Sequence, residues 1–230
     1  MLSRIFDADN VVFRFFRMVG NIWWLHILWL VCSIPIITIG ASTTALCYSS
    51  MKLRRQEGYI TSNFFKSFKE NFAQSTILFL IYTVALALLL ADIVLGNQMG
   101  TQLGKALKYG SIAILVPYIL SAVYVYAVQS RFVNPIGKTI QYSFMIALTH
   151  LKDTIQIVIL VGLVIWLNTT IVLFNFITIT IGIGILFYFL SAYYNRVFSK
   201  YIDDSKEELV GESYLDQLER QIEEEKQEKG

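Results

Sequence analysis

Four long stretches without a charged residue constrain this 230-residue chain more than any other feature. They lie between Arg17 and Lys52, Glu70 and Asp92, Lys108 and Arg131, and Asp153 and Arg196. A membrane-spanning helix needs about 20 apolar residues, and soluble domains do not normally carry several such runs. The chain is also only 16% charged, against roughly 25% in soluble domains. The pattern predicts an all-α, polytopic helical membrane protein.

The three later runs predict four full spans. The second and third runs each match one span, over residues 72–95 and 109–130. The fourth run is long enough for two spans, over residues 154–173 and 177–195, joined by a tight turn. Its polar breaks are Asn168, Thr169, Thr170 and Asn175, which place the turn near residues 173–177.

The first run is too long for one span and too short for two. As a single helix its 34 uncharged residues would measure about 51 Å, whereas the hydrocarbon core of a bilayer is about 30 Å thick. Pro35 lies near its middle and Gly40 follows, and proline interrupts helical hydrogen bonding. Residues 21–53 are therefore predicted to form a broken pair of short helices, either a re-entrant hairpin or one strongly tilted span.

The distribution of basic residues favours the re-entrant hairpin. If the first run crosses once, five Lys and Arg residues lie on the side of the N-terminus and eleven on the other side. If it enters and returns, the counts become fourteen and two, which fits the positive-inside rule better. We therefore expect four spans plus the hairpin, with both termini cytoplasmic; a five-span topology with the N-terminus outside is the competing arrangement.

The ends of the chain differ from its middle. Residues 1–20 carry Arg14 and Arg17 among apolar residues and predict an amphipathic segment at the cytoplasmic interface. Residues 21–200 form the predicted helical membrane domain. Residues 201–230 hold eleven Asp and Glu against four Lys and Arg, and predict an acidic cytoplasmic tail that is either a solvated helix or disordered.

No arrangement of residues predicts catalysis. Cys32 and Cys47 form no metal-binding pattern with histidine, His26 has no second ligand beside it, and Asp92 lies near the end of its apolar run. Walker A and nucleophile-elbow sequences are also missing. The sequence predicts a protein without catalytic residues, cofactor, metal or nucleic-acid partner, whose surroundings are the lipid bilayer.

Two sequence segments resemble a known family. They are Pro35-Ile-Ile-Thr38-Ile-Gly40-Ala-Ser-Thr-Thr-Ala45 and Asn63-Phe-Phe-Lys-Ser-Phe68-Lys69-Glu-Asn71-Phe72. Together they look like the YesL-like integral membrane proteins, the family called domain of unknown function 624, found mostly in Gram-positive bacteria. The resemblance implies a bacterial plasma-membrane protein whose relatives are often encoded beside carbohydrate ABC transporters.

The resemblance implies an accessory role in the assembly, stability or regulation of a carbohydrate ABC transporter, with its permease subunits as partners. A small secondary transporter or channel is the alternative. The expected structural signature, which is also the candidate partner contact, consists of Pro35, Thr38, Gly40, Asn63, Phe65, Phe68, Lys69, Asn71 and Phe72.

Overall fold

The computed structural model describes residues 11–201, and every regular element in that range is helical. The elements are α1 (Val11–Cys32), η2 (Ile36–Thr38), α2 (Ile39–Arg55), α3 (Ile60–Gln98), α4 (Gln102–Arg131), α5 (Ile136–Thr149), α6 (Leu151–Thr170), α7 (Val172–Ile177), the π-helix η3 (Thr178–Gly182) and α8 (Ile183–Phe198). The chain divides after Tyr193 into two compact units, and the first holds all the helices up to α7, η3 and most of α8. The predicted acidic tail lies outside the described residues.

Five helical segments among the described residues are long and apolar enough to cross a membrane. They are Phe13–Cys32, Ile60–Gln98, Gln102–Arg131, Leu151–Thr170 and Val172–Phe198. The chain is therefore a multi-pass membrane protein, and the predicted all-α class is confirmed. The segments correspond to the first arm of the predicted N-terminal pair and to the four predicted spans.

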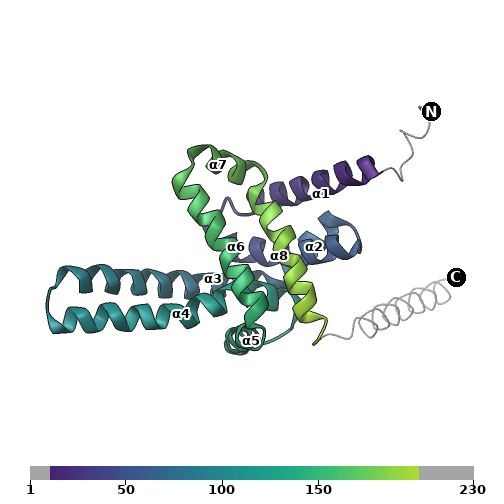
Figure 1. Ribbon diagram of the computed structural model, residues 1–230. Coiled ribbons are helices and arrows are strands. Elements are labelled where there is room, and N and C mark those ends of the chain that lie inside the picture. The colour runs from purple at the N-terminus through teal and green to yellow at the C-terminus, as the bar shows by residue number, and fades with distance from the viewer. Residues whose placement is uncertain (1–10, 202–230) are drawn as a thin grey trace, which may run out of the picture. The chain divides into compact units, whose positions relative to one another are not determined.

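The N-terminal pair is a helical hairpin. α1 ends at Cys32, and after a short break that includes η2 the chain continues as α2, which Figure 1 shows returning beside α1 toward the end where α1 begins. α1 continues through Gly20 without interruption, so residues 11–20 extend the first arm instead of forming a separate interfacial helix. Gly40 lies in the first turn of α2 rather than in the break, because the chain regains helical geometry at Ile39.

α3 and α4 form a long antiparallel hairpin that projects past the N-terminal pair in Figure 1. α3 has 39 residues, about 58 Å at 1.5 Å per residue. It exceeds the predicted span 72–95 because the basic segment before that span continues in the same helix. α4 likewise begins at Gln102, before the predicted span 109–130, with Thr101 capping it by accepting a hydrogen bond from the Gly104 backbone N–H at 3.2 Å.

A bend precedes the last membrane segment and a π-helical turn lies within it. α6 ends at Thr170 and the chain bends at Ile171, slightly earlier than the interval 173–177 that the polar residues indicated. After the single turn of α7 comes the π-helix η3, and only then α8. In Figure 1 α6 and the part of α8 up to Tyr193 run across the direction of α3 and α4.

Two apolar clusters hold this unit together. The first joins Leu25 and Leu28 of α1, Ala45 and Leu46 of α2, and Phe64 of α3, all at most 8% exposed. The second, made of Leu78, Tyr82 and Val125, joins α3 to α4. α2 is the central helix, since ten of its seventeen residues are buried. Most serine and threonine side chains of α2 are therefore surrounded by protein and do not face lipid.

Candidate functional site

The break between α1 and α2 turns its polar groups inward. Pro35 is exposed and starts the 3₁₀ turn with φ −73° and ψ 115°. Thr38 is buried, and its Oγ1 lies 2.5 Å from the Cys32 carbonyl oxygen and 2.6 Å from that of Pro35, to which it donates. Ser33 and Ser42 share a hydroxyl–hydroxyl bond of 2.6 Å across the break. These side chains satisfy carbonyl groups that the interruption of the helix leaves free.

Gly40 is a point of close approach between α2 and α3. A Cβ atom at this position would lie 2.7 Å from the Phe79 Cβ and 2.9 Å from the Ser75 carbonyl carbon, closer than real atoms approach. One turn further, the hydroxyls of Thr44 and Ser75 share a hydrogen bond of 2.8 Å. Small residues that let two membrane helices approach, with a hydroxyl bond beside them, are a common packing device. The roles of Gly40 and Thr38 are thus structural.

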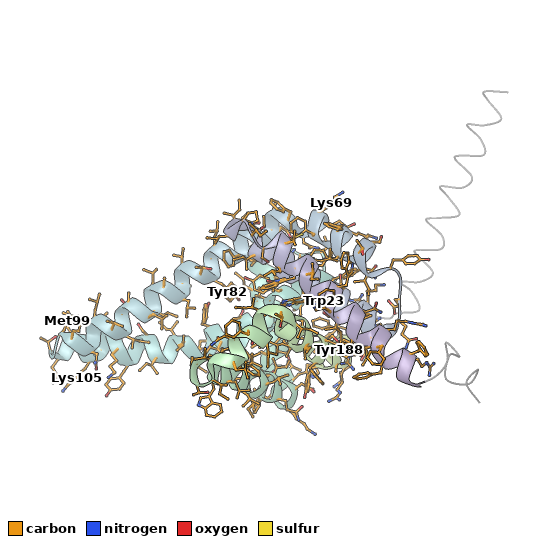
Figure 2. The ribbon with its side chains drawn as sticks, turned by 90° about the horizontal axis from the view of Figure 1, so that it is seen from above. Trp23, Lys69, Tyr82, Met99, Lys105 and Tyr188 are labelled. Carbon is orange, nitrogen blue, oxygen red and sulfur yellow. The ribbon has the colours of Figure 1, made fainter. Side chains whose placement is uncertain are left out.

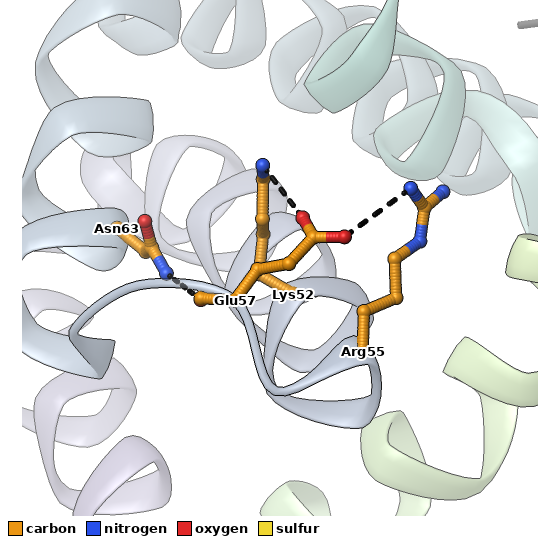
Figure 3. A network of polar contacts seen from close by, with 4 residues as sticks. All are labelled: Lys52, Arg55, Glu57 and Asn63. Atoms are coloured by element: carbon orange, nitrogen blue, oxygen red, sulfur yellow. Dashed lines mark hydrogen bonds and ion pairs between the residues drawn. The ribbon is translucent and has the colours of Figure 1, made fainter. Parts of the chain in front are cut away.

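Asn63 closes the turn between α2 and α3. Its Nδ2 donates to the Glu57 carbonyl oxygen at 2.9 Å, next to Gly58, which has φ 65° (Figure 3). The Glu57 carboxylate is 2.8 Å from the Lys52 Nζ and 3.6 Å from an Arg55 guanidinium nitrogen. The turn residues are therefore fixed to the end of α2, and Asn63 itself belongs to this internal network.

The segment that begins at Asn63 has two faces. Phe64 is fully buried, and Phe68 stacks on it with ring centroids 6.3 Å apart and packs against the first apolar cluster. The opposite face carries Phe65 and Phe72, each 39% exposed, and the exposed Lys66 and Lys69. We call Phe65, Lys66, Lys69 and Phe72 the α3 stripe; Figure 2 shows Lys69 pointing away from the helices. Positions i, i+4 and i+7 share a helix face, which explains the separation.

Asn71 faces inward and belongs to a polar network that the sequence did not predict. Its Oδ1 accepts a hydrogen bond of 3.1 Å from the Gln129 Nε2, which also donates to the Gln74 Oε1 at 2.7 Å. The Gln129 Oε1 accepts from the Thr139 hydroxyl at 3.3 Å, and Gln129 is only 3% exposed. The network joins α3, α4 and α5, with Gln129 at its centre bonded to both other amide side chains. The sequence feature that could have indicated this network is the presence of Gln74 and Gln129 inside uncharged, apolar runs.

His26 links α1 to the interrupted last segment. It is 1% exposed, and its ring bridges the Ile179 carbonyl oxygen, 2.7 Å from Nε2, and the Gly184 backbone N–H, 3.3 Å from Nδ1. Because the backbone N–H donates to Nδ1, the proton of this neutral ring is on Nε2, which donates to Ile179. A π-helix leaves backbone groups without their usual partners, and His26 supplies them here. His26 therefore has a structural role, because both of its ring nitrogens bond to the backbone of the last segment.

Asp92 lies near the end of the α3–α4 hairpin at which the two helices are connected. Its Oδ2 accepts a hydrogen bond of 3.2 Å from the Ser111 hydroxyl, and nearby the Lys108 Nζ donates to the Asn97 Oδ1 at 2.9 Å. Within residues 11–201 no three His, Cys, Asp or Glu side chains gather closely enough to hold a metal ion. The predicted signature residues do not form one site: Pro35, Thr38 and Gly40 lie where α2 begins, whereas Asn63 and the α3 stripe follow its other end. Asn71 faces α4 and α5.

Comparison with known proteins gives one match. Residues 22–93 match the family described as "Protein of unknown function, DUF624". No curated protein and no solved structure is detectably similar to the chain. The matched range covers α1 from Ile22, all of α2 and most of α3, and it contains all nine predicted signature residues. Over this range the chain is similar to the DUF624 family, the YesL-like membrane proteins.

Proposed function

We propose that the protein is a non-catalytic accessory subunit of a carbohydrate ABC transporter in the bacterial cell membrane, with both termini in the cytoplasm. The proposal draws on the resemblance described above, because relatives are often encoded beside such transporters. Its role would be the assembly, stability or regulation of the permease subunits.

The observation that carries the proposal is the two-faced start of α3. The inward face is fixed by Phe64, Phe68 and Asn71, so the outward residues are held in one orientation. That outward face, the α3 stripe, carries two lysines between two phenylalanines. Exposed aromatic side chains flanked by charge are typical of protein contact sites, where aromatic anchors supply most of the binding energy.

The internal polar groups also support a structural rather than a transporting role. Gln129 donates to both Asn71 and Gln74, and His26 bonds to backbone groups of the last segment. Side chains that are satisfied in this way stabilise helix contacts and offer few open partners to a solute.

The proposal is tested by crosslinking the tagged full-length protein in native membranes, purifying it and identifying what accompanies it by mass spectrometry. The informative variant is Phe65→Ala/Lys69→Ala/Phe72→Ala, which alters the stripe and leaves Phe64 and Phe68 in place. A matched control is Ile77→Ala/Val84→Ala, which removes exposed apolar side chains, 43% and 56% exposed, further along the same helix.

We expect permease subunits of a sugar transporter to accompany the wild type and the control, and to be lost with the stripe variant. Recovery of the protein alone would overturn the accessory role. Recovery of permease subunits that is unaffected by the stripe variant would keep the role and exclude the stripe as its contact surface.

A small secondary transporter or channel is the second candidate. The π-helical turn η3 within the last membrane segment favours it, because π-turns inside α-helices are frequent at functional sites. Flux of sugars or ions into liposomes that contain only this protein discriminates between the candidates. Flux above that of empty liposomes supports transport, and its absence supports the accessory role.

A further inference from the structure

The break between α1 and α2 exposes apolar side chains and turns its polar side chains inward. Ile34, Ile36 and Ile37 are 76%, 72% and 58% exposed, while the hydroxyls of Ser33, Thr38 and Ser42 bond inward. A turn at the water interface normally exposes polar residues and buries apolar ones. An exposed turn made of three isoleucines and a proline is suited to hydrocarbon, where inward hydroxyls must replace water as partners of the backbone.

The lengths of the two arms place the tip inside the bilayer. Seventeen residues separate Arg17 from Ile34 and fifteen separate Ile37 from Lys52. At 1.5 Å per residue these arms measure about 26 Å and about 22 Å, and tilting shortens their depth. Both values are below the ~30 Å thickness of the hydrocarbon core, even when the basic residues are placed at its edge.

α3 gives a second, independent measure of how deep the tip of the hairpin lies. Gly40 packs against Phe79, and thirteen residues separate Phe79 from Asp92 near the outer end of α3. That stretch of helix is about 20 Å long. The tip extends beyond Gly40 by about one turn, or ~5 Å, so it ends roughly 15 Å short of Asp92. The tip is therefore too far from the outer polar level to reach water there.

We infer that α1 and α2 form a re-entrant hairpin whose tip, Ile34–Ile37, ends among lipid acyl chains near the middle of the bilayer. The partner of this surface is hydrocarbon, and both ends of the hairpin lie on the same side of the membrane. The inference rests on exposure and helix lengths and does not depend on the proposed function.

Cysteine accessibility tests the inference. The full-length protein, with Cys32→Ala/Cys47→Ala as the background, receives Ile36→Cys. Tyr59→Cys, at a position that is 86% exposed between α2 and α3, reports the side of the hairpin ends, and Gln102→Cys at the α3–α4 turn reports the other side. Each is treated with a membrane-impermeant maleimide in right-side-out and in inverted vesicles, and gel filtration in detergent verifies that each variant is folded.

We expect each control to react from one side, and the two from opposite sides. Ile36→Cys should react at least about tenfold more slowly than both from either side, because the thiolate that attacks maleimide is disfavoured in apolar surroundings. Fast labelling from the side that reaches Gln102→Cys would mean that α1 crosses the membrane and would overturn the inference.

A depth measurement verifies the lipid contact separately. A small fluorophore attached at Ile36→Cys is reconstituted with lipids that carry a nitroxide either deep in the acyl chain or at the headgroup. Stronger quenching by the deep nitroxide is the expected result. Equal or stronger quenching by the headgroup nitroxide, or no quenching by either, would overturn the assignment to acyl chains.

Discussion

Replacing Gly40 by alanine should destabilise the protein, although alanine is the better helix former. The added Cβ would approach the Phe79 Cβ to 2.7 Å and would also press on the Ser75 backbone, which is part of a helix and cannot rotate away. α2 must then move away from α3. The move weakens the 2.8 Å bond between Thr44 and Ser75 and loosens the packing of Ala45.

The magnitude follows from three terms. Forced overpacking costs about 1–3 kcal/mol. A weakened hydroxyl bond between membrane helices costs about 0.6 kcal/mol, and replacing glycine by alanine in a helix returns about 1 kcal/mol. We expect a net loss of roughly 0.5–2.5 kcal/mol in the free energy of unfolding for Gly40→Ala.

The assay is reversible unfolding in mixed micelles, followed by helical circular dichroism and by thermal stability. Gly162→Ala is the matched control, because a Cβ at Gly162 in α6 meets no atom within 4 Å. That variant should be neutral or stabilised by up to about 1 kcal/mol. Gly40→Ala that is as stable as the wild type, or that behaves like Gly162→Ala, would refute the close approach of α2 and α3.

Two further substitutions test the buried polar contacts. Gln129→Leu should cost about 1–2 kcal/mol, since Asn71 and Gln74 lose their shared donor, and the loss should shrink when Gln74→Leu is added, which a double-mutant cycle in the same assay measures. His26→Leu should lower the thermal stability and speed hydrogen exchange at the backbone N–H of Gly184, which no longer has its acceptor; unchanged exchange there would contradict the bridge.

The sequence predicted those features that follow from local composition. Uncharged runs indicated the spans, because hydrocarbon excludes charge, and Pro35 indicated the break, because proline removes a helical donor. The positions of helix ends were predicted less well. The segment before residue 72 is polar enough to lie outside hydrocarbon, yet nothing in it stops a helix, so α3 begins at Ile60.

The roles of single residues depended on which helices pack together. Asn63 and Lys69 lie in one short segment, yet one closes an internal turn and the other faces outward. The helical period predicts that such a segment has two faces but not which face meets protein. The partners of Gln129 and His26 lie 58 and 153 residues away in sequence, so no local pattern could have identified them.

The unbroken length of α3 has a mechanical consequence. The helix runs from Ile60 to Gln98 with no proline and with its first glycine at Gly96, so it lacks the usual causes of a kink. At its far end α3 meets α4 closely, since a Cβ at Gly104 would lie 2.8 Å from the Gly96 carbonyl oxygen. One uninterrupted helix thus connects the α3 stripe with this second close approach, so a tilt at one end is carried to the other.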